Sequence, residues 1–321
     1  MKKLVLIALA LFAATQAHSA DVLRIALQKT GTAAWEIDLI KARGLDKAAD
    51  LDLQTTELAS PEAGKIALQG GSADMIVSDW LWVARERSLG DKLLFTPYSS
   101  ALGALMVKAD SPIKGVADLE GKSIGVAGGP IDKSWLLLQG AARKQGFDLA
   151  AKAKPLFGAP PLIAEKFAQG EMDAALEFWN FAADLEGRGF KRAIDMVDVE
   201  KALGAEGPVA MTGYVFSEDF AATHKEPLRR FFAALGKARA ILAAEPDAWG
   251  PIKAKLRVAD DVALEIYHKR YLEGAPKRPI ADEAKDAAML YATLAELGGK
   301  ALVGDAKALD AALFYDPDGG R

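Results

Sequence analysis

The 321-residue sequence contains no cysteine and only three histidines. The absence of thiols excludes disulfides, thiolate metal sites, a cysteine nucleophile and a lipid-modified N-terminal cysteine. Forty basic against 44 acidic side chains give a formal charge of -4, so we expect no nucleic-acid partner. None of the catalytic spacings HExxH, GxSxG or the calcium loop is present. This composition favours binding over catalysis.

Long hydrophobic runs are missing after the N-terminus. The chain begins with Met1-Lys2-Lys3, continues with an apolar run from Leu4 to Ala14 and reaches Ala20 through small residues. This pattern predicts a signal peptide over residues 1–20, with cleavage after Ala17 or Ala20. No later apolar run reaches the 18 or so residues of a membrane span. We therefore expect an exported periplasmic protein without a lipid anchor.

Strand-like and helix-like segments alternate along most of the chain. The pattern predicts strands at 22–27, 51–57, 74–77 and 93–95, then a second series from 101 to 186, and mostly helices after 216. Such alternation is typical of parallel βαβ units. We predict an α/β fold of two lobes, with residues 21–101 and 210–321 in lobe 1 and residues 102–209 in lobe 2. Extended crossings near 100–104 and 209–213 form the expected two-strand hinge, with a ligand cleft between the lobes.

One segment of each predicted lobe resembles the other. Residues 65–74 and 166–173 both read as a helix, a turn and an aspartate, and a tryptophan follows each aspartate six residues later. Ligands of open α/β sheets bind outside the carboxyl ends of the strands. The similarity predicts two equivalent strand ends that face the cleft, and the alternative is a generic echo of βαβ units.

Candidate ligand-binding residues gather at these predicted strand ends. The aromatic candidates are Trp35, Trp80, Trp135 and Trp179, for which core packing is the alternative. The polar candidates are Gln28, Lys29, Ser78, Asp79, Ser99, Ser100, Gly129, Asp132, Glu177 and Asn180. Together they predict a polar and aromatic cleft.

Asp79 and Glu177 are the sharpest pair, since each precedes a tryptophan. Two carboxylates near tryptophans suit a cation, an amine or a nitrogen-rich ring. The alternative for Asp79 is a helix N-cap before Trp80. We predict no metal site, because scarce histidine and absent cysteine leave only a hard cation as a minor possibility. The glycines of residues 125–130 match neither the dinucleotide nor the phosphate-loop pattern, so no cofactor is expected.

Four segments carry a resemblance to a known family. They are VLRIALQ at 22–28, QGGSAD at 69–74, DLEGKSIGV at 118–126 and QGEMDAA at 169–175. These segments resemble the periplasmic binding proteins of nitrate, sulfonate and taurine ABC importers, a group that includes binders of thiamine-pyrimidine precursors. The resemblance implies a two-lobe fold that closes over a small molecule and delivers it to an inner-membrane permease. The acids Asp79 and Glu177 depart from an anion pocket and favour a cationic or planar nitrogenous ligand.

Three hypotheses of function follow. The leading one is a monomeric solute-binding component of an ABC importer, without a catalytic step. The second is a periplasmic sensor or partner protein that delivers a ligand to another protein. The third, an acid–base enzyme, would use Asp79 and Glu177 as its proton-transfer pair.

Overall fold

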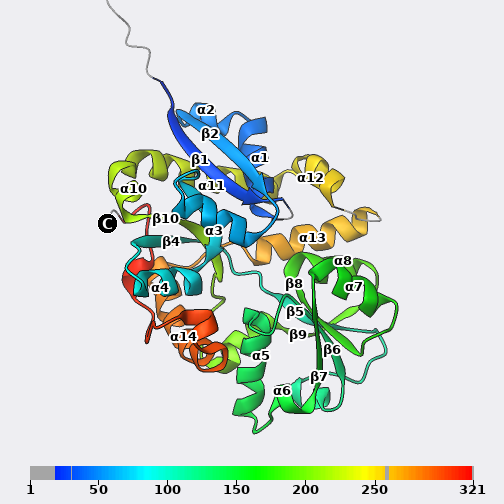
Figure 1. Cartoon of the computed structure of the whole chain (residues 1–321). Helices are drawn as coiled ribbons and strands as arrows, with labels where there is room; N and C mark the ends of the chain where they lie inside the picture. The colour runs from blue at the N-terminus through cyan, green and yellow to red at the C-terminus, as the bar shows by residue number, and fades with distance from the viewer. Residues whose placement is uncertain (1–18, 30, 257–259, 320–321) are drawn as a thin grey trace, which may run out of the picture.

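Two five-stranded sheets organise the chain in the computed structural model, which describes residues 19–29, 31–256 and 260–319 (Figure 1). Most of the predicted signal peptide, residues 1–18, lies outside the described residues. The first sheet has the order β2-β1-β3-β10-β4, from β1 (Asp21–Gln28), β2 (Leu51–Leu58), β3 (Met75–Asp79), β4 (Leu93–Ser99) and β10 (Thr212–Ser217). The second has the order β7-β6-β8-β5-β9, from β5 (Gly103–Val107), β6 (Ser123–Ala127), β7 (Lys154–Gly158), β8 (Ala174–Phe178) and β9 (Lys191–Asp195). We call the first sheet with its helices lobe 1 and the second lobe 2.

In both lobes, the sheet edge at which the parallel strands end lies where the two lobes meet. In lobe 1, β1 runs parallel to β2 and β3, and β10 runs antiparallel to β3 and β4. In lobe 2, β6 runs parallel to β7 and β8, and β5 runs antiparallel to β8 and β9. The chain crosses between the lobes at 100–102 and 204–211. The strands that follow these crossings start at the edges where parallel strands end, since Gly103 pairs with Phe178 of β8 and Thr212 pairs with Asp79 of β3. The two-lobe α/β fold predicted from the sequence is confirmed.

Local sequence sets where the helices begin. The helices of lobe 1 before the first crossing are α1 (Ala33–Ala42), α2 (Leu45–Ala48), α3 (Pro61–Gln69) and α4 (Trp80–Ser88). Those of lobe 2 are α5 (Lys133–Lys144), α6 (Leu149–Lys152), α7 (Pro160–Ala168), α8 (Trp179–Gly187) and α9 (Met196–Leu203). Ser60 caps α3 by accepting the Ala63 N–H, as its position before Pro61 predicts. No described helix is both long and apolar enough to cross a membrane.

The C-terminal helices touch both lobes. They are α10 (Glu218–Thr223), α11 (Lys225–Ala244), α12 (Gly250–Lys255), α13 (Asp261–Glu273) and α14 (Ile280–Val303). Helix α13 packs on α8 of lobe 2, while α14 packs on α4 of lobe 1 and on α5 and α9 of lobe 2 (Figure 1). One hydrophobic cluster accordingly includes Phe95 of lobe 1, Val126 of lobe 2 and Leu290 of α14. The lobes therefore share packed helices in addition to the two crossings.

The internal similarity corresponds to one structural unit used twice. The Asp74 carboxylate accepts the N–H of Arg24, and the Asp173 carboxylate accepts the N–H of Ser123, each fifty residues earlier. Trp80 and Trp179 then begin α4 and α8 in the two lobes. The repeated aspartates therefore fasten the third strand of each unit to the first.

We expect Asp173→Ala to lower the free energy of unfolding by about 1–3 kcal/mol, because the carboxylate accepts both the N–H and the hydroxyl of Ser123. Urea denaturation measures this change. The matched control is Glu171→Ala in the same turn, where the lost ion pair with Lys166 is exposed and worth little. Equal effects of the two substitutions would contradict the assigned role of Asp173.

Candidate functional site at the lobe junction

An ion pair crosses the junction. Asp79 ends β3 in lobe 1, Lys133 begins α5 in lobe 2, and the Lys133 ammonium lies 3.2 Å from the Asp79 carboxylate. Asp79 also accepts the Trp82 N–H at 2.9 Å, which confirms its N-cap alternative. Burial alone would raise the pKa of Asp79, but Lys133 and the Trp82 N–H lower it below its usual value. Asp79 is therefore an ionised carboxylate that already has a cationic partner.

Two further acids lie on the lobe 2 side. Asp132 caps α5 by accepting the N–H groups of Ser134 and Trp135. Glu177, near the end of β8, is 1 % exposed, and neither of its carboxylate oxygens has a hydrogen-bond partner among the described residues. Burial raises the pKa of Glu177 to about 9, the nearby Phe178 N–H opposes this shift, and the charge of Asp132 adds to it. Glu177 is consequently protonated and neutral at pH 7.

Aromatic rings of the two lobes also meet at the junction. Trp35 of lobe 1 and Trp179 of lobe 2 pack edge to face with ring centroids 5.8 Å apart. Trp249, which the sequence pattern did not place with the site, also packs edge to face on Trp35, with ring centroids 6.2 Å apart. Three tryptophans from distant parts of the chain therefore pack together at the junction.

A narrow cavity lies next to Trp179 and has room for about one water molecule. Its lining residues are Glu36, Tyr98, Ser99, Trp179, Tyr271, Gly274 and Ala275. Glu36, which is 1 % exposed, accepts from Arg239 at 3.0 Å and from the Tyr271 hydroxyl at 2.7 Å. Its second carboxylate oxygen has no partner in the described part of the chain. Sequence reasoning missed this network because Glu36 and Arg239 are 203 residues apart.

The other predicted site residues fall into three groups. Gln28, Lys29, Ser99, Gly129 and Asn180 lie at the junction edge with exposed or half-buried side chains, and Ser78 lies beside Asp79 in β3. Trp80 is fully buried and packs on Tyr291, and Trp135 is buried against Phe157. For these two tryptophans the structure agrees with the alternative of core packing. Ser100 holds the first crossing by donating its N–H to the Gly274 carbonyl at 2.9 Å. Lys133 was missed, although its place directly after the N-cap Asp132 was a readable signal.

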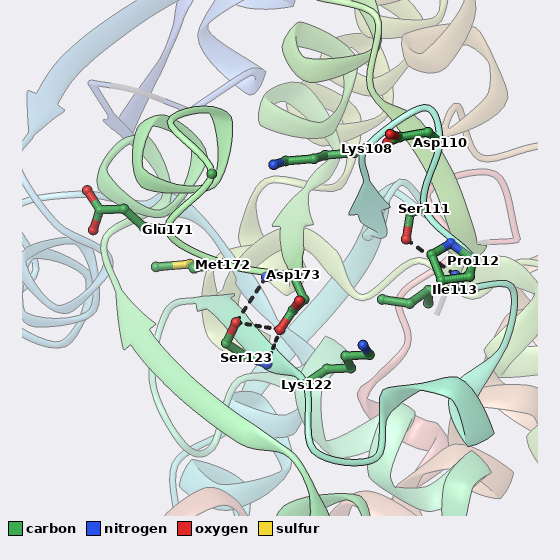
Figure 2. A pocket seen from close by; sticks show the side chains of 11 residues that line it. Lys108, Asp110, Ser111, Pro112, Ile113, Lys122, Ser123, Glu171, Met172 and Asp173 are labelled. Carbon is green, nitrogen blue, oxygen red and sulfur yellow. Dashed lines mark hydrogen bonds between the residues drawn. The ribbon is translucent and has the colours of Figure 1, made fainter.

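A second hollow, of about 330 Å³, lies at the opposite edge of lobe 2. Lys108, Lys122 and Met172 help to line it, and Figure 2 shows its Asp173 bonded to Ser123. It is open, lies where β6 and β8 begin, and contains none of the predicted site residues. Within the described residues there is also no group of three or more side chains able to hold a metal ion. The lobe junction is therefore the better candidate site.

The family profile described as NMT1/THI5-like matches residues 40–249, well over half of the chain. The chain belongs to this family. No curated protein sequence matches it.

Solved structures similar to this NMT1/THI5-like chain include two sulfonate-binding proteins. The periplasmic aliphatic sulphonate binding protein SsuA from Escherichia coli is 22% identical, with a TM-score of 0.71 over 89% of this chain and 94% of that one. The alkanesulfonate-binding protein SsuA from Xanthomonas axonopodis pv. citri, bound to MOPS, is 21% identical, with a TM-score of 0.65 over 92% and 98% of the two chains. The desulfurization enzyme DSZB is 15% identical, with a TM-score of 0.55 over 89% and 98%. The resemblance to periplasmic binding proteins is thereby confirmed.

In this NMT1/THI5-like protein, we expect Lys133→Met to lower the free energy of unfolding by about 1–3 kcal/mol at pH 7, because Asp79 loses its counter-charge. Without Lys133, burial, which is the largest influence on the pKa of Asp79, is opposed only by the Trp82 N–H and by the charge of Lys65. We therefore expect this carboxylate to take up a proton more readily as the pH falls, which relieves the penalty. In the native protein, the Asp79–Lys133 pair contributes to the free energy of unfolding at every pH above the unfolded-state pKa of aspartate. This contribution is lost only as the pH falls through the lowered pKa of Asp79 in the folded state. The deficit of the variant should therefore shrink between pH 7 and pH 4 in urea denaturation.

The control for this prediction is Arg143→Met in the last turn of the same helix. Its ion pair with Glu296 is exposed, so we expect a change within about 0.5 kcal/mol at either pH. A deficit of Lys133→Met that does not depend on pH would contradict the role assigned to Asp79.

Proposed function

We propose that the protein is a periplasmic solute-binding component of an ABC importer, which captures a small molecule between its lobes and passes it to an inner-membrane permease. The two-lobe fold shared with sulfonate-binding proteins supports this function. The observation that carries it is the junction itself, where strand ends of both lobes bring Asp79, Lys133 and the unpartnered Glu177 into one electrostatically coupled group. In this proposal residues 1–20 are a signal peptide, and the mature chain acts as a monomer.

Capture requires the lobes to separate and close again. The cavity at the junction has room for about one water molecule, and Trp179 of lobe 2 already packs on Trp35 of lobe 1. A ligand therefore enters an open form, and closure by hinge bending removes it from water. In this proposal one moving lobe consists of residues 21–101 and 210–321, and the other consists of residues 102–209.

The favoured ligand is planar and nitrogenous. A protonated carboxyl group offers one O–H donor and one carbonyl acceptor, the complement of a ring edge that carries N–H beside an unprotonated nitrogen. Glu177 is in this state at pH 7, since burial raises its pKa to about 9. Asp79 adds no net repulsion or attraction, because Lys133 balances it. A cationic ligand remains the other branch of this proposal, and it requires Glu177 to lose its proton first.

The environments of Asp79 and Glu177 favour a role in binding rather than in catalysis. Asp79 is occupied by Lys133 and by the N-terminus of α4, so it is not free to exchange protons with a substrate. The enzyme alternative requires turnover that is lost in Glu177→Gln. A variant that only changes affinity contradicts it.

A thermal-shift screen tests the ligand class. Its compounds are aminopyrimidines, amines, betaines, alkanesulfonates and nitrate, each added to the purified mature protein. A ligand at a hundredfold excess over its Kd adds about 2.7 kcal/mol to the free energy of unfolding and raises the melting temperature. We expect an aminopyrimidine-like compound to do so. A shift produced only by sulfonates or nitrate would contradict the nitrogenous ligand.

The pH profile of binding separates the two branches. For a neutral planar compound that stabilises the protein, we expect a constant affinity from pH 6 to pH 8 and a fall above pH 9, as Glu177 ionises. Isothermal titration calorimetry measures this profile. A permanently charged cation instead displaces one proton, so its affinity would rise by about tenfold per pH unit between pH 6 and pH 8.

Glu177→Gln is the matched variant for this profile, because an amide keeps one donor and one acceptor but does not titrate. We expect this variant to bind the planar compound and to show no decrease in affinity above pH 9. A rise of affinity with pH in the native protein would refute the planar branch and favour the cationic one.

A further inference from the structure

The second crossing between the lobes is held by carboxylates rather than by a sheet. Residues 204–211 connect α9 of lobe 2 to β10 of lobe 1. Three acids surround this segment and are at most 1 % exposed, and we call them the carboxylate clamp: Glu200 of α9, and Glu283 and Asp286 of α14. An acid this deeply buried needs partners, and the clamp finds them in the backbone of the crossing.

The three clamp acids accept hydrogen bonds from every backbone N–H between residues 206 and 210. Pro208, within this segment, has no N–H to donate. Asp286 accepts the N–H groups of Glu206 and Gly207 at 2.9 and 3.1 Å, Glu200 accepts that of Val209 at 3.3 Å, and Glu283 accepts that of Ala210 at 2.8 Å. Burial raises the pKa of Glu200 and of Glu283, and a carboxyl group keeps an acceptor oxygen whether or not it carries a proton. The crossing is therefore fastened to α9 and α14 at once.

One cation completes the arrangement. The Arg278 guanidinium lies 2.8 Å from Asp286 and also donates to the Pro208 carbonyl at 3.2 Å. A Cβ atom at Gly207 would come within 2.9 Å of this guanidinium, so the glycine allows the close approach. Arg278 thus links the carboxylate clamp to the carbonyl side of the same segment.

Helix α14 also contacts the helices that carry the site. It packs on α4, which begins directly after Asp79, and on α5, which begins at Lys133 (Figure 1). A Cβ at Gly140 of α5 would lie 2.4 Å from Thr293 of α14, so these two helices are in close contact. Contact with α4 includes the Trp80–Tyr291 ring pair, with centroids 6.4 Å apart.

We propose that the carboxylate clamp unites the crossing 204–211, α9 and α14 into one rigid piece that turns with lobe 2. Bending is then confined to the crossing 100–102 and the start of β10, and α14 slides along α4 at the Trp80–Tyr291 contact. Glu200, Glu283 and Asp286 are positioning residues in this arrangement, because they set how Lys133 approaches Asp79 without touching a ligand. The inference rests on the proposed capture by hinge closure, and it moves α14 from lobe 1 to lobe 2.

Backbone hydrogen exchange tests the clamp directly. In Glu283→Ala we expect the Ala210 amide to lose roughly tenfold of its protection, while amides of β1 and β6 keep theirs. Glu283→Gln should restore most of the protection, since its carbonyl oxygen still accepts. The matched control is Asp282→Ala, an exposed acid one residue earlier in α14, which should change nothing at Ala210. Unchanged protection in Glu283→Ala would overturn the proposal.

The attachment of α14 is measured with spin labels, which the absence of native cysteine makes specific. Exposed positions suit the labels: Thr56→Cys in lobe 1, Ala150→Cys in lobe 2 and Ala288→Cys in α14. In double electron–electron resonance of the unliganded protein, we expect a narrower distance distribution for the 150–288 pair than for the 56–288 pair. Equal widths, or the reverse order, would overturn the proposal.

The labelled chain carries an intact clamp, so this comparison stands even if Glu283→Ala fails to fold. Neither measurement uses a ligand. Failure of the ligand screen would therefore leave both results unaffected, and failure of the clamp would leave the screen unaffected.

Discussion

The shortness of the first crossing constrains the whole arrangement. Only residues 100–102 separate β4 of lobe 1 from β5 of lobe 2, and three residues span at most about 10 Å. The end of β4 must therefore lie against the start of β5. Since β1 and β3 run in the same direction as β4, and β6 and β8 run opposite to β5, their carboxyl ends are brought to the same junction. The polar strand ends of both lobes meet for this reason.

Burial at the lobe junction gives Asp79 and Glu177 different protonation states. Asp79 and Glu177 look equivalent in the sequence, but the repeated unit aligns Asp79 with Phe178 and Glu177 with Ser78. The one-residue offset places them on opposite faces of their strands. Asp79 becomes a helix cap with a lysine partner, whereas Glu177 is buried without one and keeps its proton. Two residues of similar sequence context thus carry different charges at neutral pH.

Much of the fold was predictable because its signals are local. Alternating strands and helices, the Ser60–Pro61 helix start and the repeated aspartates each depend on residues close in sequence, and the structure has them as expected. Strand β9 was missed, since it is a short edge strand whose side chains are exposed or half-buried and show no apolar run. The apolar face of α14 was readable, but its seat on α4, α5 and α9 was not, because those helices come from distant parts of the chain.

The sequence alone determined the fold class, the strand ends that form the candidate site and the absence of thiol chemistry, because these follow from residue types and short spacings. Tertiary structure decided which charges are present. Lys133 meets Asp79 across 54 positions, Arg239 meets Glu36 across 203, and Glu283 meets the crossing backbone across 73. Whether a carboxyl group is paired, capped or protonated depends on burial and on such partners. No local pattern contains that information.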